Sequence, residues 1–550
     1  MPNDFDLSAP SHPGAGPAGV SRRQLLSLIG RAAGGSAMYS AMSTLGLAQE
    51  SPYRGARPLT GGRRDQTILV LGAGMAGLVA AYELRNAGYT VKVLDYNQRA
   101  GGRSWTLRGG DVFTELGGER QECRFEHGLY LNPGPWRLPH HHHAMLDYAH
   151  RLKVPLEPFM MVNYNSYLHS SKAFGGKPQR VKRIQADFHG HVAELLGKVT
   201  AQHQLDAAVT REDQEKLLEA LRDWGALDEQ HRYARNLTSA VRRGYDIAPG
   251  GGLMPLPQPS EPIALNEILD SGLWKYLSAG ADYDFQQAIF QPVGGMDAIA
   301  MALYREVKDL VQLNAKVTAI HQDAAGVTVR YVPSHGSGPA HTVRADWCVC
   351  TIPLSVLSQL ELTVQPALRE AIEAVPYAAS VKIGLQFKRR FWEQDEQIYG
   401  GISFTDLPIQ MVSYPSTNYG HAGKGVLLGG YLFGPHAYEF TAMPPAERVR
   451  RAVEYGTQIH AQYPQEFEHG VAVGWHRVPW ILGCYGQWTD DMRAKHYQTL
   501  CTQDGRLVLA GEHASMIPAW QEGAVLSSLD AIQRLHAQIL ATHPLHKASV

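Results

Sequence analysis

The stretch "TILVLGAGMAGLVAAYELRNAGYTVKVLD", residues 67–95, decides the fold class of this chain. A β-branched run, a glycine turn, an Ala- and Leu-rich segment and a second β-branched run follow one another. This order predicts a strand, a helix and a second strand. Two parallel strands joined by such a crossover form one βαβ unit. We therefore expect an α/β protein whose first sheet begins here.

Three glycines of this stretch, Gly72, Gly74 and Gly77, have the spacing G-x-G-x-x-G between the first strand and the helix. Because they lack side chains, the backbone can approach a pyrophosphate, whose charge the helix N-terminus favours. Asp95 closes the second strand, where its carboxylate can accept a hydrogen bond from a ribose hydroxyl. The pattern predicts a dinucleotide site, but FAD and NAD share it.

The segment "RAGGRSWT", residues 99–106, favours FAD. Its two glycines and Arg103 follow Asp95, so the N–H groups of the Arg103 guanidinium would lie beside the pyrophosphate of the dinucleotide. This segment, "GAGMAGLVAAYEL" and the C-terminal "VLAGEHASMIPAWQEGAVLSS" together resemble the flavin amine oxidase superfamily, which includes monoamine, polyamine and L-amino-acid oxidases. The resemblance covers about residues 65 to 540.

The resemblance implies FAD, held without a covalent bond, and a set of residues around it. "FQPVGGMDAIA" (290–300) and "NAKVTAI" (314–320) are similar to the family's second flavin segment, which would place Val317 near the adenine. The cofactor-binding residues that it implies are Gly72, Gly74, Ala76, Gly77, Asp95, Arg99, Gly102, Arg103, Val317, Gly511, Glu512 and Trp520.

The segment "GPWRLP", residues 134–139, resembles the substrate loop of L-amino-acid oxidases, whose arginine binds the substrate carboxylate. Arg137 has the matching position, and a guanidinium fork suits a carboxylate. The resemblance extends to "YAASVKIGLQFKRRFW" (377–392), where Lys382 would hold a water near flavin N5. It also extends to "MVSYPS" (411–416), where the Tyr414 hydroxyl would join Arg137. Trp520 would lie beside the flavin ring, and Tyr485 would form an aromatic wall.

Four histidines, His140–His143, follow this loop. Pro139 suits the first turn of a helix, so we expect the histidines to line a solvated first turn. Consecutive helical residues point in different directions and cannot converge on one ion. The five cysteines also lack the spacing of a zinc site. The sequence therefore predicts no metal site.

Cys484, in "LGCYGQW" (482–488), resembles the cysteine that carries covalent flavin in monoamine oxidases. The amino-acid-oxidase character of the substrate loop favours a dissociable FAD instead. Together these features predict an FAD-dependent L-amino-acid oxidase whose small-molecule substrates are an L-amino acid and oxygen. The alternatives are a monoamine or polyamine oxidase, an oxidative decarboxylating monooxygenase of amino acids, and a flavoprotein that binds without turnover.

The near balance of 51 basic and 52 acidic residues argues against a nucleic-acid binder. Arg22 and Arg23 precede a mildly apolar stretch that ends at Ala48, which is typical of a twin-arginine export signal and predicts a periplasmic or secreted protein. No later stretch is long and apolar enough for a membrane span. We expect a homodimer.

We expect a Rossmann-type FAD-binding domain, an α+β substrate-binding domain and a helical insertion. The predicted limits are 1–48 for the export signal, 62–115, 286–375 and 475–545 for the FAD-binding domain, 116–172 and 376–474 for the substrate-binding domain, and 173–285 for the helical insertion.

Overall fold

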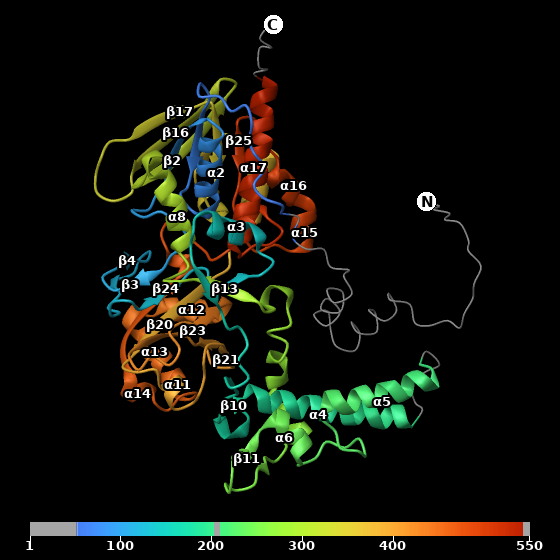
Figure 1. Ribbon diagram of the computed structural model, residues 1–550. Coiled ribbons are helices and arrows are strands. Elements are labelled where there is room, and N and C mark those ends of the chain that lie inside the picture. Colours follow the sequence, from blue (N-terminus) through green and yellow to red (C-terminus); the bar gives the residue numbers. More distant parts are fainter. Residues whose placement is uncertain (1–50, 52, 203–208, 543–550) are drawn as a thin grey trace, which may run out of the picture.

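The computed structural model describes residues 51, 53–202 and 209–542. Two lobes lie one above the other, and a helical arm extends from the lower lobe (Figure 1). The upper lobe contains a five-stranded sheet and a four-stranded sheet, and the lower lobe contains a seven-stranded sheet. The predicted export signal lies outside the described residues.

The five-stranded sheet is parallel and has the order β14-β2-β1-β18-β25. Its strands are β14 (Val311–Gln312), β2 (Thr90–Leu94), β1 (Thr67–Leu71), β18 (Trp347–Cys350) and β25 (Leu507–Leu509). They come from three separate parts of the chain. The α/β prediction is confirmed, since β1, α2 (Met75–Asn86) and β2 form the expected βαβ unit.

Both faces of this sheet are buried, because successive side chains of a strand point to opposite faces. Ile68 and Val70 of β1 pack with helices α2, α8 (Ala298–Val307) and α17 (Gln521–Thr542). Leu69 and Leu71 pack instead against the four-stranded sheet. The core of the upper lobe therefore has two layers, one on each side of β1.

The four-stranded sheet has the order β17-β16-β15-β19. Its strands are β15 (Ala315–Asp323), β16 (Gly326–Pro333), β17 (His341–Ala345) and β19 (Glu361–Leu362). Two residues separate the end of β14 from the start of β15, so β15 leaves the end of the parallel sheet directly. This connection places Val317 beside the carboxyl ends of β1 and β2.

The seven-stranded sheet has the order β10-β9-β21-β22-β23-β20-β24. Its strands are β10 (Gln179–Arg180), β9 (Tyr167–His169), β21 (Ile402–Thr405), β22 (Met411–Ser413), β23 (Gly425–Phe433), β20 (Ser380–Phe387) and β24 (Phe467–Gly474). All eight residues of β20 are buried. Val381 and Ile383 pack toward α12 (Gly434–Ala442) and α13 (Pro445–Thr457), so Lys382 points to the opposite face.

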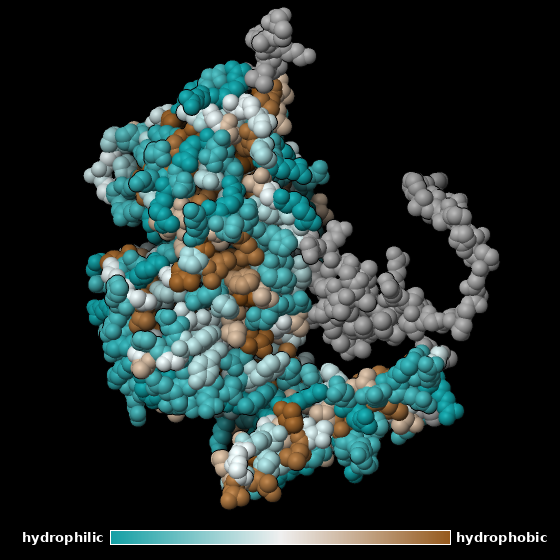
Figure 2. Space-filling model, in the orientation of Figure 1, coloured by the Kyte–Doolittle hydropathy of each residue, from teal (hydrophilic) through white to brown (hydrophobic). Residues whose placement is uncertain are grey.

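The arm consists of α4 (Val181–Ala201), α5 (Arg211–Gly225), α6 (Leu237–Arg243), α7 (Leu265–Ser271), β11 (Tyr245–Ile247) and β12 (Gln258–Pro259). The Thr210 side chain caps α5 by accepting a hydrogen bond from the Asp213 amide. Leu253 and Leu256, in the loop between β11 and β12, are exposed. Hydrophobic residues gather on the surface of this part of the arm (Figure 2). The domain limits stay predictions.

The remaining elements connect these layers. They are β3 (Leu107–Arg108), β4 (Val112–Thr114), β5 (Arg120–Glu122), β6 (Tyr130–Leu131), β7 (Leu138–Pro139), α3 (His143–Arg151), β8 (Leu156–Pro158), β13 (Ile289–Pro292), α9 (Leu354–Leu357), α10 (Pro366–Ala374), α11 (Phe391–Gln394), α14 (Tyr463–Glu466), α15 (Asp490–Met492) and α16 (Gln498–Cys501). No helix in the described ranges is long and apolar enough to span a membrane.

Candidate active site

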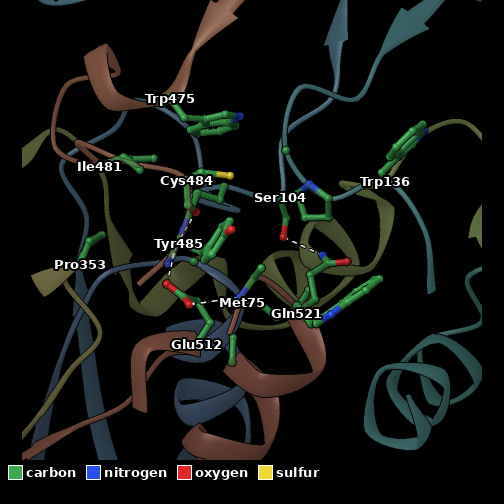
Figure 3. A pocket seen from close by; sticks show the side chains of 18 of the residues that line it. Met75, Ser104, Trp136, Pro353, Trp475, Ile481, Cys484, Tyr485, Glu512 and Gln521 are labelled. Carbon is green, nitrogen blue, oxygen red and sulfur yellow. Dashed lines mark hydrogen bonds and ion pairs between the residues drawn. The ribbon is translucent and has the colours of Figure 1, made fainter. Parts of the chain in front are cut away.

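A cavity of about 570 Å³ extends from the glycine turn of the five-stranded sheet to β20 and β23 of the seven-stranded sheet. Cys484, Tyr485 and Trp475 lie on one side of it, and Trp136 and Gln521 lie across from them (Figure 3). The cavity therefore joins the predicted cofactor residues and the predicted substrate residues in one continuous space.

The glycine turn leaves no room for side chains. Gly72 has a φ of 107°, and a Cβ added there would lie 2.4 Å from Thr351 Oγ1. A Cβ on Gly77 would lie 1.8 Å from the Gly72 carbonyl oxygen, so helix α2 can pack this closely only with glycine. Gly74 precedes α2 without a side-chain cap. The first amide groups of α2 can therefore serve as donors for an anion in the cavity.

Asp95 is fixed at the end of β2. Its Oδ2 accepts a hydrogen bond of 2.6 Å from the Ala73 amide, and its Oδ1 accepts one of 2.7 Å from the Asn97 amide. Burial raises the pKa of this carboxyl group. Asp95 and Val317 both line the cavity, as the ribose and adenine assignments require.

Arg103 forms an ion pair with Glu512, because its Nη1 lies 2.7 Å from Glu512 Oε1. The same Nη1 donates to the Cys484 carbonyl oxygen at 2.9 Å. Arg103 thus connects the segment after β2 with the C-terminal segment, and both lie along the cavity. A phosphate would meet a guanidinium that already has one carboxylate partner.

The cavity is lined by most of the predicted cofactor residues: Gly72, Gly74, Ala76, Asp95, Gly102, Arg103, Val317, Gly511, Glu512 and Trp520. The expectation that Arg99 contacts the cofactor is corrected, because Arg99 does not line the cavity. Its guanidinium lies over the Trp105 ring and donates to the Gly102 carbonyl oxygen at 2.8 Å. Arg99 therefore supports the loop that presents Gly102 and Arg103. Gly77 also lies behind the lining and acts through packing.

Lys382 holds the substrate loop. Its Nζ donates to the Gly134 carbonyl oxygen at 2.6 Å and to the Asn132 carbonyl oxygen at 3.3 Å. The ammonium also lies 4.5 Å from the centre of the Tyr431 ring. Burial lowers the pKa of Lys382 to about 7. The side chain can therefore change its charge near neutral pH while facing the cavity.

Arg137 lies in an aromatic box at the other end of the cavity. Its guanidinium carbon is 4.8 Å from the Trp136 ring centre, 4.5 Å from Phe285 and 5.4 Å from Trp520. Within the described ranges its Nε has no hydrogen-bond partner and its guanidinium forms no ion pair, although the more distant charge of Asp284 acts on it. Burial lowers the pKa of Arg137 to about 10, so it stays charged. Arg137 is therefore a buried cation that could still bind an anion directly, because no described carboxylate lies within ion-pair distance of it.

Aromatic side chains form part of the cavity wall. Tyr485 and Trp520 both line the cavity, and so does Cys484. Burial raises the pKa of the Cys484 thiol. Its sulfur is drawn toward the cavity in Figure 3, beside Trp475. These residues surround the space between Lys382 and the glycine turn.

The expected role of Tyr414 in binding the substrate carboxylate is also corrected. Its side chain is 1% exposed and does not line the cavity. Its hydroxyl lies 2.7 Å from both Ser403 Oγ and His460 Nε2, inside the core of the lower lobe. It cannot contact a ligand beside Arg137.

Tyr431 lies where Tyr414 was expected. It is directly opposite Lys382 in the ladder between β20 and β23, and it lines the cavity. The charge of Arg137 acts on the Tyr431 phenol. Sequence analysis missed it because it lies in the apolar run "GVLLGGYLF" (425–433). The feature that marks Tyr431 is its pairing with the buried Lys382 on the neighbouring strand, and this pairing is visible only in the structure.

The histidines also differ from expectation. Pro139 ends β7, which pairs with β13, and helix α3 begins only at His143. His141 and His142 are buried, with 8% and 1% exposure. The prediction of a solvated first turn is therefore wrong, and the reasoning against a metal site that relied on helical directions does not apply to these two residues.

Comparisons with known proteins agree with this geometry. The family described as flavin containing amine oxidoreductase matches residues 75–536. The flavin-dependent L-tryptophan oxidase of Lentzea aerocolonigenes is 29% identical over 86% of this chain and 99% of its own. The L-amino-acid oxidase of Siganus canaliculatus is 27% identical over 87% of each chain.

Solved structures show the same fold. A putrescine oxidase bound to putrescine has a TM-score of 0.55 at 17% identity and covers 86% of this chain and 99% of its own. Cyclohexylamine oxidase from Brevibacterium oxydans has a TM-score of 0.55 at 15% identity and covers 87% of this chain and 99% of its own. At these identities the likeness concerns the fold.

Proposed function

Because the chain belongs to the family of flavin containing amine oxidoreductases, we propose that it is an FAD-dependent L-amino-acid oxidase. Its relatives in the family include oxidases of L-amino acids. The proposed reaction converts an L-amino acid, water and oxygen into a 2-oxo acid, ammonia and hydrogen peroxide. The family implies a flavin, and the substrate class rests on the cavity.

The observation that carries the proposal is the unpaired guanidinium of Arg137. A buried charge is costly unless a partner compensates it, and the aromatic rings around Arg137 offer only weak compensation. A substrate carboxylate would supply that partner through two hydrogen bonds. A plain amine has no such group, so a site for amines would have no use for this cation.

The cofactor end of the cavity fits FAD. The uncapped N-terminus of α2, the Gly72 turn and Arg103 suit a pyrophosphate, and Asp95 suits a ribose hydroxyl. When bound, FAD would supply the redox chemistry by accepting a hydride from the α-carbon and passing electrons to oxygen.

The residues of the chain orient the substrate and exclude water. Arg137 would bind the carboxylate, and the Tyr431 phenol lies close enough to its charge to assist. Lys382 keeps the loop that carries Arg137 in place through the Gly134 carbonyl oxygen. Trp520 and Tyr485 narrow the cavity around the reacting carbon. Fixed orientation of this kind lowers the barrier to hydride loss.

The test is product analysis with the twenty L-amino acids, their D-forms and a set of amines. We expect peroxide, ammonia and a 2-oxo acid from L-amino acids. Peroxide from amines alone would indicate a monoamine or polyamine oxidase. An amide would indicate a decarboxylating monooxygenase, and the absence of any product would indicate a binding protein. Each of these outcomes contradicts the proposal.

We expect FAD to dissociate from the protein on acid precipitation. Cys484 faces the cavity, but burial raises the pKa of its thiol, which lowers the fraction of nucleophilic thiolate. The supernatant should be yellow. A yellow pellet whose colour disappears in Cys484→Ala would instead show covalent attachment. Cys501, which lies outside the cavity lining, provides the matched control Cys501→Ala.

We also propose export by the twin-arginine route, supported by the Arg22 and Arg23 pair and the weakly apolar stretch after it. The exported chain should begin near Gln49. N-terminal sequencing of the exported protein measures this directly, and an intact Met1 or Pro2 would contradict it. The homodimer stays a prediction.

A further inference from the structure

His141, His142 and Asp284 meet beside the aromatic box of Arg137. One ligand atom from each residue can be chosen so that all three atoms lie within 4.8 Å of one another. His141 Nε2 lies 3.0 Å from Asp284 Oδ1, and His142 Nε2 lies 3.9 Å from the same oxygen. The two histidines precede α3, and Asp284 follows the arm, so distant parts of the chain converge here.

These distances are close to those of a metal site. Zinc binds imidazole nitrogen and carboxylate oxygen at about 2.0 to 2.2 Å, so tetrahedral ligands lie about 3.4 Å apart. The His141 nitrogen is slightly nearer to the carboxylate oxygen than this, and the His142 nitrogen is slightly farther away. Small side-chain rotations would bring all three atoms onto one ion.

The polar atoms of His142 are the independent observation. Its side chain is 1% exposed, and neither ring nitrogen has a hydrogen-bond partner within the described ranges. Buried polar atoms normally have partners, so this histidine calls for one. A neutral imidazole is the form that binds metals.

The carboxylate is suited to the same role. Asp284 Oδ1 faces both imidazoles, at 3.0 Å from His141 Nε2 and 3.9 Å from His142 Nε2. Its side chain is 35% exposed, which leaves a path for an ion from solvent. Glu522 is nearby, but its two oxygens accept hydrogen bonds from the amides of Ala144 and Met145. Asp284 is therefore the acidic ligand.

We propose that His141, His142 and Asp284 bind one divalent transition-metal ion of the zinc type. Two imidazoles and one carboxylate match the preference of zinc for nitrogen and oxygen ligands, and water would complete the coordination. The ion would fix Asp284 against the start of α3. Phe285, the next residue, stacks on Arg137, so the metal would also hold this wall of the cavity.

The test is isothermal titration of the purified, chelator-treated holoenzyme with Zn²⁺. We expect one equivalent per chain, bound by the wild type and by two matched controls, His140→Ala and Asp282→Asn. These controls change a histidine and a carboxylate next to the cluster. Removing a residue that hydrogen-bonds to a metal ligand weakens metal binding up to about 100-fold. Removing a ligand itself, as in His142→Ala or Asp284→Asn, should therefore lower the affinity for Zn²⁺ by at least about 100-fold.

A thermal shift provides the second measurement. Zinc that binds the folded state should raise the Tm of the wild type and of His140→Ala, but not of Asp284→Asn. If His142→Ala fails to fold with its flavin, the partly exposed Asp284→Asn decides the question. Saturable binding that is unchanged in Asp284→Asn, or no saturable binding to the wild type, would overturn the proposal. Neither result depends on turnover of an amino acid.

Discussion

Arg137→Met should abolish most of the activity toward L-amino acids while sparing any activity toward the corresponding amines. Removing one partner of a buried charge pair costs about 2 to 5 kcal/mol, or roughly 30- to 4,000-fold in kcat/KM. The loss should be large because Arg137 is the cation that lies over all three rings of the box, Trp136, Phe285 and Trp520. Lys382 contacts the box at the Trp136 ring and already donates to the Gly134 carbonyl oxygen. Steady-state kinetics with an amino acid and its decarboxylated analogue measures the difference.

A matched control is Arg180→Met. The Arg180 guanidinium also lies over an aromatic ring, 4.1 Å from the centre of Tyr167, but outside the cavity lining. It should leave kcat/KM nearly unchanged. Equal losses for the amino acid and the amine in Arg137→Met would contradict a carboxylate clamp.

The two tyrosines allow a similar comparison. Tyr431→Phe should lower kcat/KM for amino acids, because it removes the hydroxyl on which the charge of Arg137 acts. The ring that contacts Lys382 is kept. Tyr414→Phe should change the stability more than the kinetics, because its hydroxyl bonds only to Ser403 and His460 in the core. A larger loss of kcat/KM in Tyr414→Phe than in Tyr431→Phe would show that Tyr414 acts on the substrate.

Lys382→Met should slow one of the flavin half-reactions by about 100-fold or more, the lower range for a positioned proton-transfer group. Lys382 is the buried amine nearest to the substrate loop, and its pKa of about 7 lets it gain or lose a proton during turnover. Below this pH it is an ammonium, and above it a neutral amine. Rapid-mixing measurements of flavin reduction and reoxidation, made across this pH range, would detect the loss.

The pH profile separates this role from a structural one. The wild type should show an inflection near pH 7 that is missing in Lys382→Met. Lys388→Met is the matched control, because Lys388 follows the same strand and donates to the Gln465 carbonyl oxygen on the surface. Unchanged rates for both half-reactions in Lys382→Met would remove it from the site.

The sequence predicted the parts of the fold that depend on local spacing. The turn at Gly72 and the βαβ unit follow from residues that lie close together in the chain, and they were predicted correctly. Asp95 was placed for the same reason. Ten of the twelve expected cofactor residues line the cavity, and several of these are glycines or directly follow a strand.

The errors arose where strand pairing decides the position. Tyr414 and Tyr431 lie on neighbouring stretches of one sheet, and a shift of one residue moves a side chain to the other face. The sequence gives no register for these strands. Likewise, β13 pairs with β7 and takes Pro139 into a ladder, so α3 starts later than its composition suggests. Long-range pairing overrode the local helix signal.

The most direct test of the central claim is anaerobic mixing of the wild-type holoenzyme with its best L-amino acid and, separately, with the amine that this acid gives on decarboxylation. The claim is that the buried guanidinium of Arg137 selects a carboxylate. The flavin absorbance should therefore bleach at least about 30-fold faster with the amino acid, the lower limit for a desolvated charge pair. Bleaching that is equally fast or faster with the amine would contradict the account.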